Sequence, residues 1–322
     1  MRVGVAFTPF ETRAGTIVRL ATRADELGLA RVDVAEGWTH DATILLAEIA
    51  QRTERIGLGA SILSVWGRSP ATMALTAAGL QRCSGGRFRL GIGAGSPPLT
   101  EGFHGLPWDR PVGQLRRTLT AVRALLAGER LPEPVPGARP LRLGALPETP
   151  VPLALAALSP ASIRLAGELA DAWAPFLWAR SRLADGRELL REGGDARVAV
   201  GVPVALGHSE AEARRMAAWW LTTYLTRMGP LYPRLLGHRF GMADAVEALL
   251  EGALAKRADL PAAAEALARD VTLLGTYDDA AAAIGAWFAA GADELQLVLP
   301  PGHPEEQLEE IIELAAAAPS PA

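Results

Sequence analysis

Apolar and polar positions along the chain follow two periods in alternation, which predicts strands and helices in turn. Short runs rich in Val, Ile and Leu have the period of two, or the continuous apolar character, of buried strands. The strands expected from these runs are residues 3–8, 32–35, 56–63, 88–93, 151–156, 172–175, 198–205 and 294–299. Amphipathic segments with helical spacing lie between them, among them residues 15–27, 41–52 and 112–127.

Polar residues mark several of the expected helix starts. Ser69 and Ser159 each precede a proline, which is the usual combination of an N-cap with a first helical residue. Residues 209–212 (Ser-Glu-Ala-Glu) have the spacing of a capping box before a long helix, and residues 276–279 (Thr-Tyr-Asp-Asp) open another helix.

The alternation favours one α/β architecture over another. Eight strands that alternate with helices over 322 residues predict a (β/α)8 TIM barrel. A doubly wound open sheet is the alternative, but that fold normally has a glycine-rich turn after its first strand. Here the first strand is followed by Thr8, Pro9 and Phe10, and no glycine occurs before Gly15.

Two segments interrupt the alternation, after the fourth strand and between the seventh and eighth. Residues 129–150 contain six prolines, so we expect an extended excursion without a helix. Residues 230–270 contain two helical patterns, at 243–257 and 261–269, and this insertion either covers the site, contacts another subunit or has no role. Residues 1–314 are expected to form a single domain, with 315–322 as a flexible tail.

Composition narrows the classes of function. Hydrophobic residues make up 49% of the chain and charged residues 21%, with a net charge of -4 and no basic stripe, which argues against a nucleic-acid partner. Cys83 is the only cysteine, which excludes an internal disulfide and a cysteine-based zinc site. The first residues lack the layout of a signal peptide and no apolar run has membrane-spanning length, so we expect a cytoplasmic protein without a membrane partner.

The expected strand ends predict where a ligand binds, because barrels bind ligands at the C-terminal ends of their strands. The fourth strand ends in Gly91, Gly93 and Gly95, which leave bare backbone for a planar cofactor or a phosphate, although such glycines also relieve crowding inside barrels. The other strand ends are rich in aromatic and small residues and lack a set of converging metal ligands. His40, at the end of the second strand, is the natural proton donor or acceptor, whereas Asp41 is better explained as an N-cap.

The chain resembles the bacterial luciferase-like monooxygenase family, in particular its deazaflavin (coenzyme F420)-dependent oxidoreductase branch. The resemblance rests on motifs that occur in the same order over nearly the whole chain. They are residues 55–62 (RIGLGASI), 68–70 (RSP), 84–93 (SGGRFRLGIG), 101–105 (EGFHG), 165–171 (LAGELAD), 274–276 (LGT) and 290–293 (AGAD).

The resemblance implies a (β/α)8 barrel with insertions and a set of cofactor contacts. The ring of the cofactor would lie over a bulge in the third strand with a non-prolyl cis peptide, here the Ser61–Ile62 bond. The positions that match the cofactor contacts are Ser61, Ile62, Gly93, Ala94, Gly95, Ala157, Leu158, Ser159 and Ala161. His40 matches a histidine near the reactive carbon in some members. Ser96 and Leu158 depart from the sugar-phosphate dehydrogenases of the family, which argues against such a substrate.

The resemblance therefore implies hydride transfer between coenzyme F420 and a small, apolar or planar substrate, with proton movement at His40. The expected substrate pocket consists of Phe10, Trp38, Trp66, Glu101, Trp173 and Trp178. An FMN-dependent monooxygenase that uses O2 and a non-catalytic flavin-binding relative are the alternatives. No metal is expected, the partner is a small-molecule substrate, and a homodimer is compatible with the resemblance.

Overall fold

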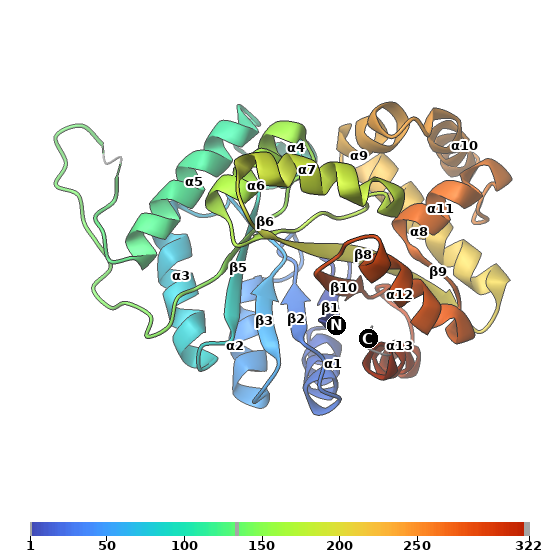
Figure 1. Cartoon of the computed structure of the whole chain (residues 1–322), viewed down its shortest axis with the longest axis horizontal. Helices are drawn as coiled ribbons and strands as arrows, with labels where there is room; N and C mark the ends of the chain where they lie inside the picture. Colours follow the sequence, from blue (N-terminus) through green and yellow to red (C-terminus); the bar gives the residue numbers. More distant parts are fainter. Residues whose placement is uncertain (1, 133–134, 319–322) are drawn as a thin grey trace.

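Ten parallel strands and their flanking helices make up the described part of the fold, and eight strand positions close into a barrel. The computed structural model describes residues 2–132 and 135–318. The strands are β1 (Val3–Phe7), β2 (Arg31–Val34), β3 (Gly57–Ala60), β4 (Leu63–Ser64), β5 (Phe88–Gly93), β6 (Leu153–Leu155), β7 (Ala172–Trp173), β8 (Arg197–Gly207), β9 (Leu273–Thr276) and β10 (Glu294–Val298). Strand β10 pairs with both β1 and β8, which closes the barrel (Figure 1). The predicted (β/α)8 TIM barrel is confirmed.

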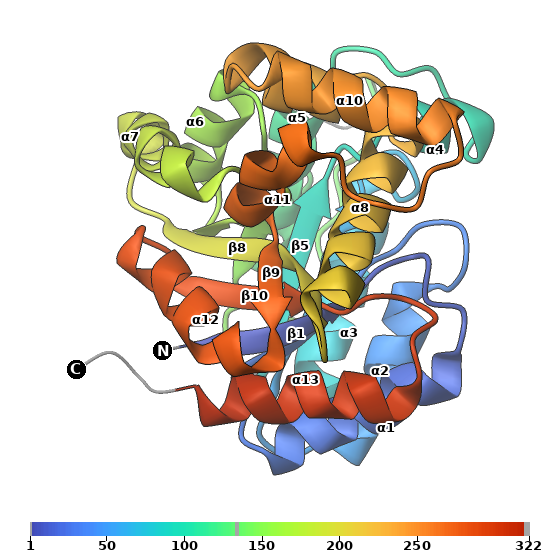
Figure 2. The same cartoon turned by 90° about the vertical axis from the view of Figure 1, so that its right-hand side faces the viewer.

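Helices surround the strands on the outside of the barrel (Figures 1 and 2). They are α1 (Ala14–Glu26), α2 (Ala42–Arg52), α3 (Pro70–Cys83), α4 (Pro97–Gly102), α5 (Pro111–Leu126), α6 (Pro160–Leu169), α7 (Leu183–Gly193), α8 (Glu210–Arg227), α9 (Leu231–Pro233), α10 (Ala243–Leu254), α11 (Glu265–Val271), α12 (Ala280–Ala289) and α13 (Glu305–Ala317). Ser69 and Ser159 cap α3 and α6 with their side chains, as predicted. The helix start predicted at residues 276–279 is also present, as a capping box of Thr276 and Asp279. Of the capping box predicted at residues 209–212, Ser209 accepts from the Glu212 N–H, but the Glu212 carboxylate accepts from the His208 N–H instead of that of Ser209.

The third and seventh strands differ from their predicted extents. The third strand is divided into β3 and β4 around the Ser61–Ile62 peptide, which is cis, as the resemblance implies. Strand β8 has 11 residues and changes neighbours along its length. Its first half pairs with β10 in the barrel, and its second half, Val204–Gly207, pairs with β9 outside it. Strand β9 was not predicted, because Leu273–Thr276 is a short run directly before a helix start.

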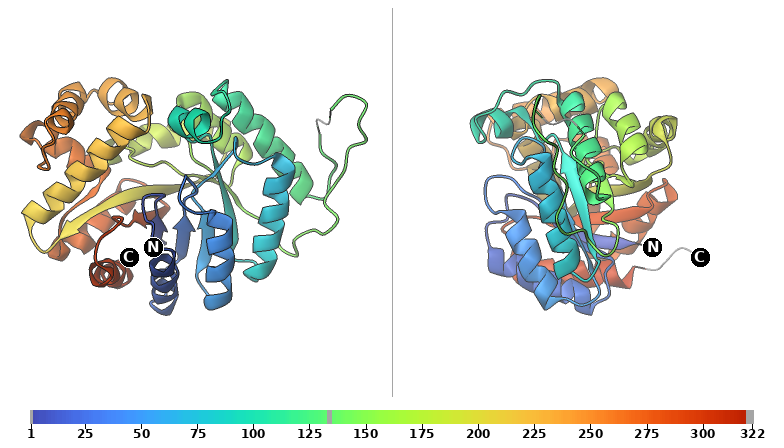
Figure 3. Two further views of the ribbon diagram at one scale, coloured as in Figure 1. Left: turned by 180° about the vertical axis from the view of Figure 1, so that it is seen from behind. Right: turned by 90° about the vertical axis from the view of Figure 1, so that its left-hand side faces the viewer.

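The two insertions have different structures. The described residues of 129–150 contain no helix or strand and project from the side of the barrel (Figure 3), as predicted, while 133–134 fall outside the described residues. The second insertion contains α9, the π-helical segment η2 (Arg234–Arg239), α10 and α11. Helix α13 continues to Ala317, so the predicted tail at 315–322 begins inside a helix, and 319–322 lie outside the described residues.

Alternation along the strands separates an outer apolar core from a polar barrel interior. Val5, Val32 and Leu90 are fully buried in one continuous core together with helix residues such as Leu20 and Leu46. The residues next to them in sequence point into the barrel because successive side chains of a strand face opposite sides. These inward positions form the walls and floor of the site described below.

Candidate functional site

A cavity of about 400 Å³ opens at the C-terminal ends of the strands. This volume lies in the range of small-molecule sites, and its lining is mostly apolar. Nine of the residues predicted to bind the cofactor or substrate line it together. They are Trp38, Ser61, Ile62, Gly93, Ala94, Gly95, Ala157, Leu158 and Ser159.

One wall of the cavity consists of backbone that is kept bare by glycines. A Cβ atom at Gly93 would lie 2.8 Å from Cγ1 of Ile62, and one at Gly91 would overlap the carbonyl oxygen of Ala60. Gly95 has a φ of 72°, in the left-handed region that favours glycine. Strand β5 therefore packs closely against β3 and Ile62, and Gly93 and Gly95 present backbone without side chains to the cavity.

The start of helix α6 forms a second part of the wall. Ser159 accepts a hydrogen bond from the backbone N–H of Ser162 at 3.2 Å, and the Ser162 hydroxyl accepts one from the Ser159 N–H at 3.1 Å. Both serines line the cavity, whereas Ala161, which was predicted to contact the cofactor, is exposed and does not. A helix N-terminus favours an anion, so this end of the cavity suits a phosphate.

The second insertion contributes to the cavity as well. Leu231 and Tyr232 of α9 line it. Arg239 in η2 donates a hydrogen bond of 2.8 Å to the carbonyl oxygen of Leu158, and its guanidinium lies 4.9 Å from the centre of the Trp178 ring. The insertion of residues 230–270 was expected to cover the site, to contact another subunit or to have no role. These contacts support the first of the three.

Aromatic side chains form a further part of the cavity wall, and the two tyrosines among them were not predicted from the sequence. Phe176, Tyr224 and Tyr232 line the cavity, with ring centres 4.9 Å apart for Phe176–Tyr224 and 5.4 Å apart for Tyr224–Tyr232. Burial raises the pKa of both tyrosines above the usual value, which keeps the phenols neutral. The sequence feature that could have indicated these tyrosines is the cluster of aromatic residues in 219–232, but such a cluster is equally typical of packing between helices.

Four residues that were predicted to belong to the site do not line the cavity themselves. They are Phe10, His40, Trp66 and Glu101. Phe10 contacts Trp38, at 5.1 Å between ring centres. Trp66 packs at a tilt against Trp108, which lines the cavity, with 5.7 Å between the ring centres. Glu101 accepts a hydrogen bond of 3.3 Å from the backbone N–H of Trp108. His40 does not line the cavity, and its Nε2 is buried without a partner among the described residues.

Trp173 and Trp178 do not lie in the predicted substrate pocket. Both are fully buried and pack edge to face at 5.1 Å, and their indole N–H groups donate to the carbonyl oxygens of Ala157 and Arg182. The reason is strand alternation, because Ala174 lines the cavity and Trp173 therefore faces outward against Gly186 of α7.

An ion-pair group lies at the rim beside Trp38. Glu36, which lines the cavity, accepts two hydrogen bonds from Arg68, at 3.2 and 2.8 Å, and Asp41 lies 3.0 Å from the same guanidinium. Asp41 also caps α2 by accepting from the Thr43 N–H, as predicted. Burial alone would raise the pKa of Asp41, but the hydrogen bonds from Thr43 and Arg68 outweigh it and lower that pKa. These contacts fix the loop after β2.

Charged and amide side chains form the cavity floor, and none of them was predicted to belong to the site. Asp33 of β2, Arg89 of β5 and Gln296 of β10 all line the cavity. Arg89 donates to Glu294 at 2.6 Å and lies 3.5 Å from Asp33. Burial raises the pKa of Asp33, whereas Arg89 and Arg31 outweigh burial at Glu294 and lower its pKa. The sequence feature that could have indicated these residues is the presence of single polar residues, Asp33, Arg89 and Gln296, within otherwise apolar strands.

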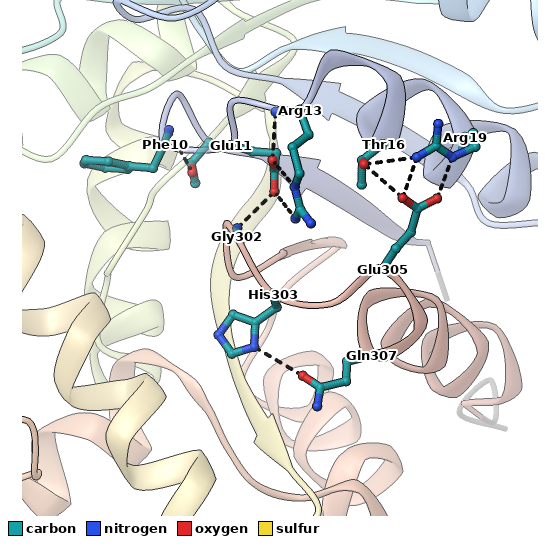
Figure 4. A network of polar contacts seen from close by, with 10 residues as sticks. Phe10, Glu11, Arg13, Thr16, Arg19, Gly302, His303, Glu305 and Gln307 are labelled. Atoms are coloured by element: carbon teal, nitrogen blue, oxygen red, sulfur yellow. Dashed lines mark hydrogen bonds and ion pairs between the residues drawn. The ribbon is translucent and has the colours of Figure 1, made fainter.

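A polar network ties the loop after β1 to the loop after β10 (Figure 4). Glu11 forms an ion pair with Arg13 at 2.7 Å and accepts a hydrogen bond from the Gly302 N–H at 3.1 Å. Nearby, Glu305 at the start of α13 accepts hydrogen bonds from Arg19 and Thr16 of α1. The network holds Thr8 and Pro9, which line the cavity, in place.

Two further findings concern metals and membranes. Among the described residues, no three His, Cys, Asp or Glu side chains converge as metal ligands would. None of the helices within 2–132 and 135–318 is both long and apolar enough to span a bilayer.

Comparison of the sequence with known proteins shows which family the chain is similar to. The sequence model of the luciferase-like monooxygenases matches residues 1–294. A Mycobacterium tuberculosis protein whose name places it among coenzyme F420-dependent oxidoreductases is 27% identical over 302 residues, which cover 84% of this chain and 87% of that protein. The 5,10-methylenetetrahydromethanopterin reductase of Methanolobus tindarius is 26% identical over 97% of this chain and 98% of its own.

The fold also recurs in solved structures. The coenzyme F420-dependent tetrahydromethanopterin reductase from Methanopyrus kandleri superimposes with a TM-score of 0.74 at 18% identity, covering 98% of this chain and 97% of that one.

Proposed function

Because the chain belongs to the luciferase-like monooxygenase family, we propose that it is a coenzyme F420-dependent oxidoreductase that transfers a hydride between the deazaflavin and a small, apolar or planar substrate. One observation supports this most directly, which is a mostly apolar cavity at the strand ends that is lined both by the backbone of Ser61–Ile62 and Gly93–Gly95 and by aromatic side chains. Flat ring systems suit such a cavity, because both of their faces need close contact.

The residues present fit this cofactor. Glycine at position 93 lets the β5 backbone lie close to the Ile62 side chain, where a Cβ atom would clash with Ile62. The backbone at 61–62 and 93–95 would hold the ring, and the start of α6, where Ser159 and Ser162 line the cavity, would hold its phosphate. When bound, a deazaflavin supplies a carbon centre that accepts or donates hydride and reacts poorly with oxygen.

The substrate would lie against the aromatic wall. Trp38, Phe176, Tyr224 and Tyr232 provide apolar faces, and the neutral tyrosines add hydroxyl groups that can orient a polar substituent. Glu36 forms an ion pair with Arg68 at the rim, so its charge is already compensated. The pocket therefore favours a neutral, largely apolar substrate.

His40 is our candidate for the proton transfer that accompanies hydride transfer. Its Nε2 is buried, has no partner among the described residues and does not line the cavity, so this role requires the loop after β2 to move when a ligand binds. We expect His40→Ala to reduce turnover far more than the affinity for F420. Equal turnover in both proteins would remove His40 from the mechanism and leave the cavity assignment intact.

A titration of the purified protein with F420 and with FMN tests the proposal. We expect F420 to bind at least tenfold more tightly than FMN, and the loaded protein to exchange hydride with a substrate without consuming O2. Tighter FMN binding with substrate-dependent O2 consumption would instead support a monooxygenase, the activity in the family's description. Binding of neither cofactor would refute both, and binding without any substrate oxidation across a panel of planar compounds would point to a non-catalytic relative.

A further inference from the structure

Two of the three tyrosines of the chain lie side by side in the cavity wall. Tyr224 lies near the end of α8 and Tyr232 lies in α9, and both line the cavity. Their ring centres are 5.4 Å apart and their ring planes are perpendicular. The ring centre of Phe176 lies 4.9 Å from that of Tyr224 and 6.4 Å from that of Tyr232, so the three rings form one aromatic cluster.

The hydroxyl groups of both tyrosines lack a protein partner. Each tyrosine is only 8% exposed, yet within the described residues neither hydroxyl takes part in a hydrogen bond. The neighbouring Trp220 differs, because its indole N–H donates to the carbonyl oxygen of Val204 at 2.8 Å. Buried polar groups are nearly always paired, so two unpaired hydroxyls at one place indicate a partner from outside the chain.

Both hydroxyls are accessible from the cavity. Some buried polar atoms of the described residues, such as Nε2 of His40, have neither a partner nor accessible surface, but neither tyrosine oxygen is one of them. Each unpaired hydroxyl therefore keeps accessible surface, and the cavity is the open space that the two side chains line. Burial raises the pKa of both phenols, and the charge of Tyr232 adds to this effect at Tyr224, so the two oxygens lie deep in the protein and near each other.

The position of the tyrosines in the barrel favours contact with a substrate over contact with the cofactor ring. Phe176 pairs with Gly201 of β8 through an isolated bridge, which fixes the aromatic cluster on the β8 side. In the closed order of eight strand positions, β8 stands four positions from β3 in either direction. The Ser61–Ile62 backbone, which would hold the ring, follows β3 and therefore lies on the opposite side of the cavity.

The charges and donors of the lining select a neutral hydrogen-bond acceptor. Asp33, Glu36 and Arg89 are the charged residues of the described lining, and each is paired with an opposite charge. A phenol whose pKa is raised stays protonated and can donate its O–H. A carbonyl oxygen has two lone pairs and no hydrogen, so it matches two such donors. A hydrogen bond to this oxygen also draws electron density from the carbonyl carbon, which favours addition of hydride there.

We propose that Tyr224 and Tyr232 bind the carbonyl oxygen of the substrate, which is therefore a neutral ketone, aldehyde or quinone with an apolar or planar skeleton. The skeleton packs between the aromatic cluster and the cofactor ring. This inference deepens the proposed function, because the assignment of the oxygen to a substrate rests on hydride transfer in this cavity. The carbonyl subsite itself is measured first without a cofactor. A protein that bound neither F420 nor FMN would refute the proposed function and leave that measurement interpretable.

The test compares acetophenone with α-methylstyrene, which have nearly the same planar shape and differ in a carbonyl oxygen against a methylene group. Tyr224→Phe and Tyr232→Phe each remove one hydroxyl and keep the ring. In isothermal titration calorimetry of the full chain, acetophenone should bind at least one of the two variants about fivefold or more weakly, because its buried oxygen loses a donor. The affinity for α-methylstyrene should stay the same or rise. Tyr277→Phe is the matched control, since Tyr277 packs against His208 and does not line the cavity, and it should change neither affinity.

Two further measurements separate a hydrogen bond from a change in packing. The infrared carbonyl stretch of bound, isotope-labelled acetophenone should lie at lower wavenumber in the unaltered protein and in Tyr277→Phe than in the variant that weakens binding, because a hydrogen bond weakens the C=O bond. The melting temperatures of Tyr224→Phe and Tyr232→Phe should be unchanged or higher, because neither change breaks a hydrogen bond within the described chain. A clear fall in both would show that the hydroxyls stabilise the protein itself, and would overturn the subsite.

A titration with F420 then separates the substrate from the cofactor. The affinity for F420 should be unchanged in Tyr224→Phe and Tyr232→Phe, and acetophenone should still bind the loaded protein. Weaker F420 binding in the variant that weakens acetophenone binding would assign the hydroxyls to a carbonyl of the cofactor and overturn the substrate assignment. The subsite is also overturned if the unaltered protein does not bind acetophenone, or if both variants keep its full affinity.

Discussion

The upper and lower parts of the barrel interior are filled by different kinds of side chain. At the upper end, inward positions hold small residues, among them Ser61, Gly93, Ala156, Ala174 and Gly201, which all line the cavity. At the lower end, inward positions hold Arg31, Asp33, Arg89, Glu294 and Gln296. Within residues 2–132 and 135–318, neither part has the layers of branched apolar side chains that usually fill a (β/α)8 barrel.

The difference shows how one barrel serves two purposes. In the upper part, the absence of side chains exposes backbone to the cavity, so a ligand supplies the missing packing. In the lower part, opposite charges hold one another across the barrel, because Arg89 of β5 reaches Glu294 of β10. The upper part is therefore expected to be sensitive to added volume, and the lower part to lost charge.

The largest effect is expected from a lost charge at the floor. Arg89→Met removes the partner of two buried carboxylates, which should lower the free energy of unfolding by about 3–5 kcal/mol at pH 7. Without Arg89, the pKa of Asp33 in the folded protein, which burial already raises, rises further, and the pKa of Glu294 rises as well because the first of the charges that lower it is lost. Such groups stabilise the fold at low pH and lose that contribution as the pH rises through the folded pKa.

Urea denaturation at several pH values checks this prediction. The deficit of Arg89→Met should be full at pH 7 and should narrow toward pH 4, where the carboxyl groups of both states take up protons. A second change, Glu294→Gln, made in the Arg89→Met background should recover part of the stability at pH 7. A deficit that is the same at both pH values would show that packing, and not charge, explains the role of Arg89.

Added volume at the upper end should have the next largest effect, and on binding instead of folding. In Gly93→Val the new side chain meets Ile62 at the cavity wall, so cofactor binding should weaken by about 1–3 kcal/mol, or about 5- to 150-fold. The measurement is a titration with F420. Gly79→Ala is the control, because a Cβ atom at Gly79 in α3 has no neighbour within 4 Å, and it should leave binding unchanged. Unaltered affinity in Gly93→Val would place the ring elsewhere.

The same contrast explains what could be predicted from the sequence. The upper part was predictable because glycines such as Gly93 and Gly95 at a strand end indicate bare backbone, and the motifs around them resemble a known family. The barrel was predictable because each of its strands has its own apolar run. Strand β9 was missed because a four-residue run carries little signal.

The floor and the aromatic wall were not predictable, for physical reasons. A charged residue in a strand, such as Asp33 or Arg89, is recognised as an ion pair only when strands that are distant in the sequence are brought together. Trp173 was placed in the pocket because its residue type suited a substrate, but the direction of its side chain depends on the alternation of a two-residue strand. Tyr232 reaches the cavity only because the insertion folds back over the barrel.

A smaller effect is expected in the network that ties the loop after β1 to the loop after β10, where buried Glu11 pairs with the partly exposed Arg13. Burial alone would raise the pKa of Glu11, but the hydrogen bonds from Arg13 and Gly302 outweigh it and lower that pKa. Glu11 therefore stabilises the fold above its unfolded pKa, and this contribution disappears as the pH falls through the folded pKa. Glu11→Gln should cost about 1–2 kcal/mol at pH 7.

The pH dependence of the stability loss distinguishes the Glu11 network from the cavity floor. The deficit of Glu11→Gln should vanish in acid, as measured by urea denaturation at pH 7 and pH 3. Glu305→Gln in the neighbouring network, whose carboxylate is more exposed, is the matched control and should cost less. An equal loss of unfolding free energy in Glu305→Gln and Glu11→Gln would show that burial is not what makes the Glu11 contact stabilising.

The smallest effect comes from two serine caps that differ only in where their helices begin. Ser159 and Ser69 both precede a proline and accept a hydrogen bond from the third residue of the helix, but only Ser159 lines the cavity. Replacing either by alanine should lower the free energy of unfolding by about 0.5–1 kcal/mol. Only Ser159→Ala should also weaken F420 binding, by about twofold to tenfold, because the helix start that would face the phosphate loses its fixed geometry. Equal effects of both variants on F420 affinity would mean that the start of α6 does not hold the phosphate, and that the glycine backbone alone retains the cofactor.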